Sequence, residues 1–369
     1  MTAISVVQIS FFRDPQGRAP AQLLQDWPTV PMLAEAASLG GARVAVVQAS
    51  AQAGRLSRGG IDYHFLPCDG EPAQLQKLLR QLQPEVLHVQ GLSFAREVLS
   101  LAQLAPGRPI VLQDRADRPP RRPWHWPLQR RALSAARGLM FSASAQAAPF
   151  RRRGLIRAGM RIYELPGSSC SFQPRDQAQA RRITGIGGDP CLLWVAHLDR
   201  NKDPLAVLEG IAQAAAQLPD LQLWCCFGSA PLMDAVQARI AADPRLTGRV
   251  HLLGAVPHER IELLMSAADF LVQGSHREAT GYSLLEALAC GLPPLMTDIP
   301  SFRALTGHGS VGRLWTAGRP ESLATALLQM AAEPRAAQRA SARACFEAQA
   351  SLEALGRKLN SAYADLLLT

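Results

Sequence analysis

Short apolar runs of strand length alternate with helical patterns along almost the whole chain. Such alternation is typical of parallel α/β sheets, because a helix connects each strand to the next strand of the same direction. The strands predicted in the first half are 4–9, 43–47, 86–89, 110–113, 139–142 and 161–165. Those predicted in the second half are 191–195, 221–227, 249–253, 270–272, 294–296 and 312–314. The chain is therefore expected to form two parallel sheets covered by helices.

A stretch rich in glycine, serine, proline and arginine, 166–190, separates the two halves. With 369 residues the chain is long enough for two domains of ordinary size. We predict an N-terminal domain over 1–170, a linker over 171–190 and a C-terminal domain over 191–345. The remaining segment, 346–369, reads as a helix with no strand after it, and we expect it to cross back to the first domain.

The composition argues against several classes of protein. No apolar run approaches the roughly 20 residues of a membrane-spanning helix, and the N-terminus lacks the features of a signal peptide. The seven cysteines are scattered without the spacing of a zinc site. We therefore expect a reduced, cytoplasmic protein that binds no metal.

Positive charge is concentrated in the first half. Residues 1–182 carry 24 Lys+Arg against 12 Asp+Glu, a net charge of +12, whereas residues 183–369 carry 15 against 18, a net charge of −3. The excess suggests an anionic partner for the first half alone. An arginine-rich proteome would produce the same excess, so both interpretations stay open.

The segment 278–286, Glu-Ala-Thr-Gly-Tyr-Ser-Leu-Leu-Glu, carries the strongest functional signal. It follows an apolar strand and leads into an apolar helix, which Ser283 is placed to cap. A helix N-terminus binds phosphate through its backbone N–H groups, and Gly281 lets a ligand approach the backbone closely. The carboxylates of Glu278 and Glu286 can accept hydrogen bonds from sugar hydroxyls. The segment therefore predicts a site for a sugar joined to a phosphate.

Four landmarks of the second half resemble those of glycosyltransferase family 4 in order and spacing. They are Val-Ala-His-Leu-Asp-Arg-Asn-Lys-Asp at 195–203, Arg-Val-His-Leu-Leu-Gly-Ala-Val-Pro-His at 249–258, the two glutamates of 278–286, and Thr-Asp-Ile-Pro at 297–300. The first half matches the family more weakly, at 85–91, 139–144 and 163–172.

This resemblance implies an α/β fold of GT-B architecture, in which two Rossmann-like domains face each other across an interdomain cleft. It also implies a metal-independent, retaining glycosyltransferase of the hexosyltransferase type. The sugar would pass from a nucleotide-diphosphate sugar, which acts as co-substrate, to a glycan, lipid-linked or small-molecule acceptor, and no cofactor is expected. The sequence does not choose the base, the sugar or the acceptor.

The same resemblance assigns donor roles to residues of the second half. Lys202 and His197 would hold the diphosphate, although the family usually has arginine in place of His197. Glu278 would bind hydroxyls of the transferred sugar and Glu286 those of the ribose. The other donor-binding residues would act through their backbone, Thr280, Gly281 and Tyr282 toward the phosphate or sugar and Gly254, Ala255 and Val256 toward the base. An exposed surface lysine and a structural histidine are the alternative interpretations of the first pair.

Arg115 is a second departure from the family. Many relatives have a histidine at or near this position, close to the transferred sugar. Arg115, or the neighbouring Asp114 or Asp117, could serve instead as a catalytic residue, or the site is weakened. The alternative function is therefore a degenerate, non-catalytic module or partner subunit that binds a nucleotide sugar.

Candidates for the acceptor or membrane side lie in the first half. Arg13 and Arg18 flank Gly17 in the loop where family members often carry a Gly-Gly pair, and Trp124 and Trp126 lie in the arginine- and proline-rich stretch 118–131. That stretch fits anionic lipid headgroups at the inner membrane face, an anionic glycan acceptor, or a surface loop without a ligand. No nucleic-acid-binding motif accompanies it, so nucleic acid is not expected as a partner.

Overall fold

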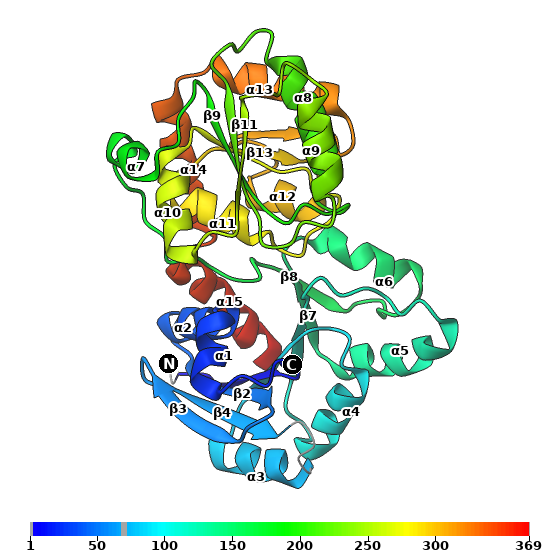
Figure 1. The fold of residues 1–369 in the computed structure, drawn as a ribbon. Helices are drawn as coiled ribbons and strands as arrows, with labels where there is room; N and C mark the ends of the chain where they lie inside the picture. The colour runs from blue at the N-terminus through cyan, green and yellow to red at the C-terminus, as the bar shows by residue number, and fades with distance from the viewer. Residues whose placement is uncertain (1–2, 68–71, 369) are drawn as a thin grey trace. The chain divides into compact units, whose positions relative to one another are not determined.

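The computed structural model describes residues 3–67 and 72–368 and divides the chain into two compact units (Figure 1). The N-terminal unit comprises Met1–Ser169 and Leu352–Thr369, and the C-terminal unit comprises Cys170–Ser351. Each unit is an α/β structure built on its own parallel sheet, which confirms the expectation of two Rossmann-like domains. Among the described helices, none is long and apolar enough to cross a membrane.

The sheet of the N-terminal unit has the strand order β3-β4-β2-β1-β5-β6-β7-β8. Its strands are β1 (Ser5–Ser10), β2 (Arg43–Ser50), β3 (Gly54–Arg58), β4 (Ile61–Pro67), β5 (Val86–Gln90), β6 (Ile110–Gln113), β7 (Gly138–Phe141) and β8 (Arg161–Glu164). Neighbouring strands are parallel except β3 and β4, which form an antiparallel hairpin. This hairpin was absent from the sequence-based prediction, because β3 is largely exposed and so has no apolar run.

The helices of the N-terminal unit cover both faces of this sheet. They are α1 (Pro20–Asp26), α2 (Thr29–Leu39), α3 (Pro72–Leu82), α4 (Ala95–Leu104), α5 (Trp126–Ala135), α6 (Ala148–Arg152) and α15 (Leu352–Leu367), with short 3-10 turns η1 (Pro123–His125) and η2 (Ser144–Ala147). Apolar residues of α3, α4 and α5 pack on one face with Ile9 and Val47, whereas those of α2 and α15 pack on the other with Val6 and Val46.

The last helix, α15, returns to the N-terminal unit and packs against α2 (Figure 1). The two helix backbones touch at a pair of glycines: a Cβ on Gly356 would lie 2.2 Å from the Ala36 carbonyl oxygen, and one on Gly40 would lie 2.2 Å from the Gly356 carbonyl oxygen. The returning helix begins at Leu352, six residues later than the segment predicted from the sequence, because α14 (Arg335–Gln349) still belongs to the C-terminal unit.

The sheet of the C-terminal unit has the order β11-β10-β9-β12-β13-β14, with neighbouring strands parallel. Its strands are β9 (Cys191–Val195), β10 (Gln222–Cys226), β11 (Val250–Gly254), β12 (Phe270–Val272), β13 (Pro294–Thr297) and β14 (Arg313–Trp315). The remaining helices are α7 (Gln177–Thr184), α8 (Pro204–Ala214), α9 (Met233–Ala241), α10 (His258–Ala267), α11 (Tyr282–Ala289), α12 (Pro300–Leu305) and α13 (Pro320–Ala331).

Residues 171–190, predicted as a linker, are part of the C-terminal unit. Helix α7 packs against α10, and Ala180 lies in the core with 1% of its surface exposed. Arg181 Nη2 lies 2.9 Å from Oδ2 of Asp269, a carboxylate that is almost fully buried. This ion pair anchors α7 in the C-terminal unit, because loss of Arg181 would leave the buried Asp269 carboxylate without this cation.

Candidate functional site

The order of strands in the C-terminal unit reverses between β9 and β12. From β9 the chain continues outward through β10 and β11, whereas from β12 it continues in the opposite direction through β13 and β14. The connections that follow β9 and β12 therefore lead toward opposite edges of the sheet. Ligands of parallel α/β sheets bind at such a point, beside the carboxyl ends of the two strands. We refer to residues 196–203 as the β9 loop and to residues 273–281 as the β12 loop.

The two loops are joined to each other by backbone and side-chain hydrogen bonds. Asn201 Nδ2 donates to the Arg277 carbonyl at 3.0 Å, and the His276 N–H donates to the Asn201 carbonyl at 2.8 Å. Gly274 permits the close approach, because a Cβ there would lie 2.7 Å from the Lys202 carbonyl oxygen. The positions of Lys202 and of the β12 loop are thus set together.

Lys202 and Glu278 form an ion pair between Nζ and Oε1 across these loops. The two side chains are only 18% and 16% exposed. Lys202 is further fixed by its own backbone, since its N–H donates to Oδ1 of Asp199 at 2.9 Å. Two residues predicted as catalytic are therefore in direct contact, and Lys202 is not the freely solvated surface lysine of the alternative interpretation.

Helix α11 begins at the end of the β12 loop. Its N-cap is Gly281, whose φ of 85° is left-handed, and a Cβ at this position would lie 2.5 Å from the Phe302 ring. The prediction that Ser283 caps the helix is wrong, because the glycine starts the helix earlier, at Tyr282. The Ser283 hydroxyl instead accepts a hydrogen bond from Gln273 Nε2 at 2.5 Å. The helix N-terminus, with its partial positive charge, lies directly after Thr280 and Gly281.

Glu286 lies on the second turn of α11, beyond the first turn where an acidic residue gains most from the helix dipole. Its Oε1 lies 2.8 Å from Nε2 of His258, at the start of α10. The hydrogen bond to Glu286 raises the pKa of His258 above its ordinary value, against an opposing effect of burial. The His258 ring also packs on Phe172, with centroids 4.8 Å apart. Glu286 thus already has one oxygen engaged by the His258 ring.

His197 lies in the β9 loop and is exposed. Its Nδ1 is 3.1 Å from the backbone nitrogen of Ser229 and accepts a hydrogen bond from that N–H. The neutral ring then carries its proton on Nε2. In this arrangement His197 is a neutral hydrogen-bond donor, whereas an arginine would be a fixed cation.

The predicted base-binding residues follow β11. Gly254 ends the strand with a φ of 72°, and its carbonyl accepts a hydrogen bond from the Phe227 N–H at 2.9 Å. Ala255 is exposed, whereas Val256 packs against the core of the unit. Gly254 thus ends the strand two places from β9, and Ala255 and Val256 follow it at the carboxyl end of the sheet.

Two further residues of this region were not among the predicted site residues. Gln273, which is 1% exposed, donates through Nε2 to the Val195 carbonyl at 2.9 Å and to the Ser283 hydroxyl, so it joins the end of β9 to α11. His258 holds Glu286, as described above. A polar residue directly after an apolar strand is a detectable signal for Gln273, whereas nothing in the local pattern pairs His258 with a residue 28 positions away.

Arg115, the fourth residue predicted as catalytic, belongs to the N-terminal unit. Its Nε donates to Oε1 of Gln90 at 2.8 Å and its Nη1 to the Gly167 carbonyl at 2.8 Å. Asp117 accepts hydrogen bonds from the backbone N–H groups of Leu92 and Arg115 and therefore holds the loop itself. These bonds fix the Arg115 guanidinium at the carboxyl end of the sheet.

Arg18 and Arg13 have different surroundings. Arg18 forms ion pairs at 2.8 Å with both Asp14 and Asp26, and its guanidinium lies over the Trp27 ring. The hydrogen bond from Arg18 holds the pKa of Asp14 well below its usual range. Arg18 therefore stabilises its own loop, whereas Arg13 lines a cavity.

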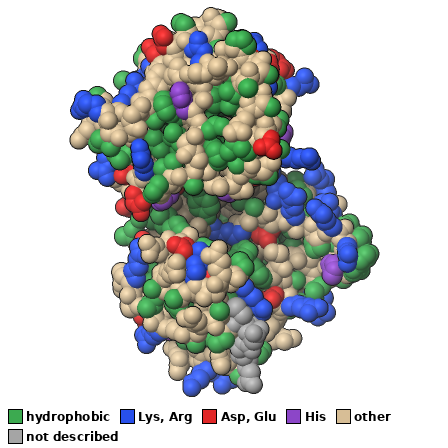
Figure 2. All heavy atoms as spheres, viewed as in Figure 1, with side chains coloured by type: hydrophobic (Ala, Val, Ile, Leu, Met, Phe, Trp, Pro, Cys, Tyr) green, Lys and Arg blue, Asp and Glu red, His purple; other side chains and the backbone are tan. Residues whose placement is uncertain are grey.

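The two tryptophans of the arginine-rich stretch also differ. Trp124 is 68% exposed, with the Arg122 guanidinium 5.5 Å from its ring centroid. Trp126 is partly buried and donates through Nε1 to the Pro120 carbonyl at 2.9 Å. Trp126 thus supports the loop, and Trp124 is the aromatic side chain that it exposes. Figure 2 shows basic side chains gathered over α5 and α6, where the sequence has arginine and no lysine.

Within residues 3–67 and 72–368, no group of three or more His, Cys, Asp and Glu side chains is arranged to hold a metal ion.

Comparison with known proteins connects this geometry to glycosyl transfer. The model of the family described as glycosyl transferases group 1 matches residues 176–345. The D-inositol 3-phosphate glycosyltransferase of Thermobispora bispora is 29% identical over 171 residues, which are 44% of this chain and 40% of that protein. The chain spans between 35% and 40% of the length of the first curated relatives that it matches.

Longer matches extend over both units. The GDP-mannose:cellobiosyl-diphosphopolyprenol alpha-mannosyltransferase of Xanthomonas campestris is 25% identical over 267 residues, 68% of this chain and 66% of that protein. Sucrose-phosphate synthase of Thermosynechococcus elongatus has a TM-score of 0.72 at 18% identity and covers 99% of both chains. HepE of Anabaena, solved in complex with UDP, has a TM-score of 0.68 at 16% identity over 98% of this chain and all of that one. The chain thus has the fold of GT-B glycosyltransferases, and its segment 176–345 matches the model of the glycosyl transferases group 1 family.

Proposed function

We propose that this chain is a retaining glycosyltransferase that moves a sugar from a nucleotide-diphosphate sugar to an acceptor hydroxyl. The observation that carries the proposal is the ion pair of Lys202 and Glu278, which lies where the strand order reverses and within the segment that matches the family. It supplies a cation for a phosphate and a carboxylate for sugar hydroxyls side by side.

Departure of the nucleoside diphosphate leaves negative charge on a phosphate oxygen, and stabilising that charge lowers the barrier to reaction. Three kinds of donor are available for it in the C-terminal unit. Lys202 offers an ammonium group, His197 offers its Nε2–H, and α11 offers the positive end of its dipole next to Gly281. These groups form the proposed diphosphate subsite.

The two glutamates bind hydroxyls in this proposal. Glu278 accepts hydrogen bonds from the transferred sugar, and the second oxygen of Glu286 accepts them from the ribose while Oε1 stays with His258. Without ligand, Lys202 and Glu278 neutralise each other, so neither charge is buried alone. On binding, Lys202 turns to the diphosphate and Glu278 to the sugar.

The reaction breaks the bond between the anomeric carbon and the phosphate oxygen and forms a bond from that carbon to the acceptor oxygen. The acceptor proton passes to the departing phosphate, and the configuration at the anomeric carbon is kept. Arg115, held by Gln90 and Gly167, is proposed to act as a fixed donor toward the transferred sugar. No metal or cofactor takes part in this scheme.

Slow hydrolysis of the donor without any acceptor tests the proposal against a non-catalytic nucleotide-sugar-binding module. A set of uridine and guanosine diphosphate sugars is incubated with the protein, and the released nucleoside diphosphate is measured. We expect release from at least one donor and its loss in Lys202→Ala. Binding of a donor without any release, in the presence or absence of acceptors, would support the non-catalytic alternative instead.

We also propose that the basic surface of the N-terminal unit contacts anionic lipid headgroups. This surface consists of Trp124 and the exposed arginines of segments 118–131 and 151–153, namely Arg118, Arg121, Arg122, Arg130, Arg131, Arg151, Arg152 and Arg153. Arginines that attract anionic headgroups around one exposed tryptophan suit a peripheral interface. Flotation with vesicles of phosphatidylglycerol should recover the protein, and vesicles of phosphatidylcholine should not. Equal recovery with both, or with neither at moderate salt, contradicts the contact.

A further inference from the structure

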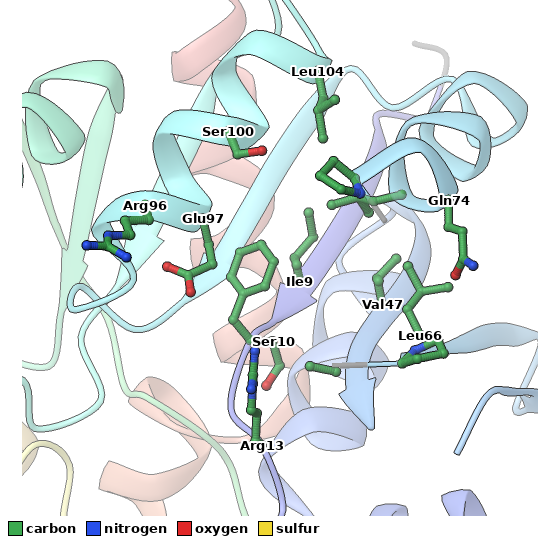
Figure 3. Close-up of a pocket in the computed structure, with 15 residues that line it drawn as sticks. Ile9, Ser10, Arg13, Val47, Leu66, Gln74, Arg96, Glu97, Ser100 and Leu104 are labelled. Atoms are coloured by element: carbon green, nitrogen blue, oxygen red, sulfur yellow. The ribbon is translucent and has the colours of Figure 1, made fainter. Parts of the chain in front are cut away.

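A cavity of about 290 Å³ opens in the N-terminal unit beside the carboxyl ends of β1, β2 and β4 (Figure 3). Its remaining walls come from α3 and α4. The volume is close to the lower end of the roughly 300–1,000 Å³ found for small-molecule sites. The carboxyl ends of parallel strands are also where such sites occur in α/β sheets. Neither the donor site nor the basic surface includes this cavity.

The interior of the cavity is apolar. Its lining includes the side chains of Ile9, Phe11, Val47, Leu66, Leu75 and Leu104. Figure 3 shows Ile9, Val47, Leu66 and Leu104 around the interior, from strands on one side and a helix on the other. A ligand part that replaces water against these walls must itself be apolar, because a polar group there would lose its hydrogen bonds.

One wall of the cavity is fixed by aromatic packing. The Phe94 ring lies between Phe11 and Phe12, with centroid separations of 5.8 and 4.8 Å. Gly91, with a φ of 101°, makes room for this ring, because a Cβ there would lie 2.8 Å from it. Phe11 is therefore held in place by its neighbours, and a ligand binds a preformed surface at little cost in ordering.

Polar side chains are gathered at the edges of the cavity. Ser10, Arg13 and Glu97 lie toward one end of it and Gln74 toward the other, with the Ser100 hydroxyl on the wall between them (Figure 3). Arg96 lines the cavity next to Glu97, and Figure 3 shows its guanidinium directed away from the other lining side chains. The lining thus has two cations, one carboxylate, two hydroxyls and an amide. The hydroxyls, the amide and the Glu97 carboxylate can bind the hydroxyls of a headgroup, and the carboxylate repels a doubly charged phosphate placed beside it.

We propose that this cavity binds an amphipathic alcohol, with an alkyl or aryl body in the apolar interior and a hydroxyl-rich headgroup at the polar edge. The inference rests on the proposed function, because it assigns this molecule as the class of acceptor. The acceptor is then a sugar or other polyol that carries an apolar group, and a free sugar lacks the part that the cavity recognises.

Binding is tested with n-octyl β-D-glucopyranoside below its micelle concentration, with methyl β-D-glucopyranoside as the control for the headgroup. Titration calorimetry should detect the octyl compound and at least tenfold weaker binding of the methyl compound. Ser100→Trp fills the cavity from α4 and should abolish octyl binding. Gln103→Trp makes the same change at an exposed position of the same helix outside the cavity lining, and it should leave binding unchanged.

Equal binding of both glucosides, or equal effects of both tryptophan variants, would overturn the proposal. If Ser100→Trp fails to fold, as judged by circular dichroism, Leu75→Asp serves instead, because it places a carboxylate against the apolar body without filling the space. Tighter binding of n-octyl phosphate than of the octyl glucoside would show that the polar edge prefers an anionic headgroup, which overturns the proposed hydroxyl-rich headgroup.

Donor binding is measured separately, so the two proposals fail in distinguishable ways. If the wild-type protein binds octyl glucoside but turns over no nucleotide sugar, the glycosyltransferase proposal is contradicted and the proposal that the cavity binds an amphipathic alcohol is kept. Turnover of a donor together with no transfer to the bound octyl glucoside would contradict the assignment of this cavity to the acceptor. Transfer to the octyl compound that is lost in Ser100→Trp and kept in Gln103→Trp supports both.

Discussion

Lys202 and Glu278 lie on loops that leave β9 and β12, 76 positions apart in the sequence, and their side chains meet in an ion pair. The contact joins the cation proposed to hold the diphosphate to the carboxylate proposed to hold the sugar. Because both side chains are mostly shielded from water, each depends on the other when no ligand is bound.

Replacement of Lys202 should therefore impair both catalysis and stability. We expect Lys202→Ala to lower kcat by about 10²–10³-fold, the loss typical of one transition-state donor. Its unfolding temperature should also fall, because the largely buried Glu278 carboxylate loses the cation that lies beside it. Lys77→Ala, an exposed lysine of the N-terminal unit, is the matched control and should change neither quantity. An unchanged kcat in Lys202→Ala would remove this residue from the mechanism.

The contact between His258 and Glu286 predicts that the stability of the folded state depends on pH. The hydrogen bond to Glu286 raises the pKa of His258 above the ordinary 6.5, so the protonated ring stabilises the folded state. This contribution is fully present below pH 6.5 and is lost as the pH rises through the raised pKa. An NMR titration of His258 should show the raised pKa in the wild type and a pKa below the ordinary one in Glu286→Gln, because burial then outweighs the small effect of Glu259.

The matched control for that titration is Glu259→Gln. Glu259 contributes less to the His258 shift than Glu286 does, and it is exposed on the first turn of α10. Its removal should lower the pKa of His258 slightly. A larger fall in Glu259→Gln than in Glu286→Gln would show that the hydrogen bond to Glu286 is not formed in solution.

Gly274 should be intolerant of a side chain. Gly274→Ala places a Cβ 2.7 Å from the Lys202 carbonyl oxygen, so the β9 and β12 loops must separate. We expect a loss of about 1–3 kcal/mol in the free energy of unfolding, as for other overpacked sites, together with weaker nucleotide-sugar binding. Gly187→Ala is the control, since nothing lies within 4 Å of the added Cβ and its φ needs no glycine. Equal stability of the two variants would contradict the close approach of the loops.

The returning helix α15 depends on a glycine contact in the same way. Gly356→Ala would place a Cβ 2.2 Å from the Ala36 carbonyl oxygen on α2. The helices must move apart, and the free energy of unfolding of the N-terminal unit should fall by about 1–3 kcal/mol or more. Urea denaturation followed by circular dichroism measures the change, and Gly187→Ala again provides the control. A wild-type midpoint in Gly356→Ala would be incompatible with the packing of α15 on α2.

Much of the fold followed from apolar periodicity. Strands such as β6 and β9 have the predicted bounds, because a buried parallel strand is a continuous apolar run. The hairpin of β3 and β4 was missed where this signal is absent. The segment 171–190 was predicted as a linker from its polar composition, yet Arg181 ties it to the buried Asp269, a long-range contact that composition does not reveal.

The candidate site was predictable to the extent that its residues lie in one local motif. The sequence of residues 278–286 predicts a loop followed by a helix N-terminus, and the structure has both. The position of the cap was misjudged, because the left-handed backbone of Gly281 starts the helix before Ser283. The partners of the two glutamates, Lys202 and His258, come from other loops, and only the three-dimensional fold pairs them.

The most direct test of the account is a crystal structure of the protein with a bound nucleotide sugar. We predict that the diphosphate lies within hydrogen-bonding distance of Lys202 Nζ and the N-terminus of α11, with Glu278 turned from Lys202 to the sugar hydroxyls. A nucleotide sugar bound elsewhere in the protein, with the ion pair of Lys202 and Glu278 intact, would contradict the account.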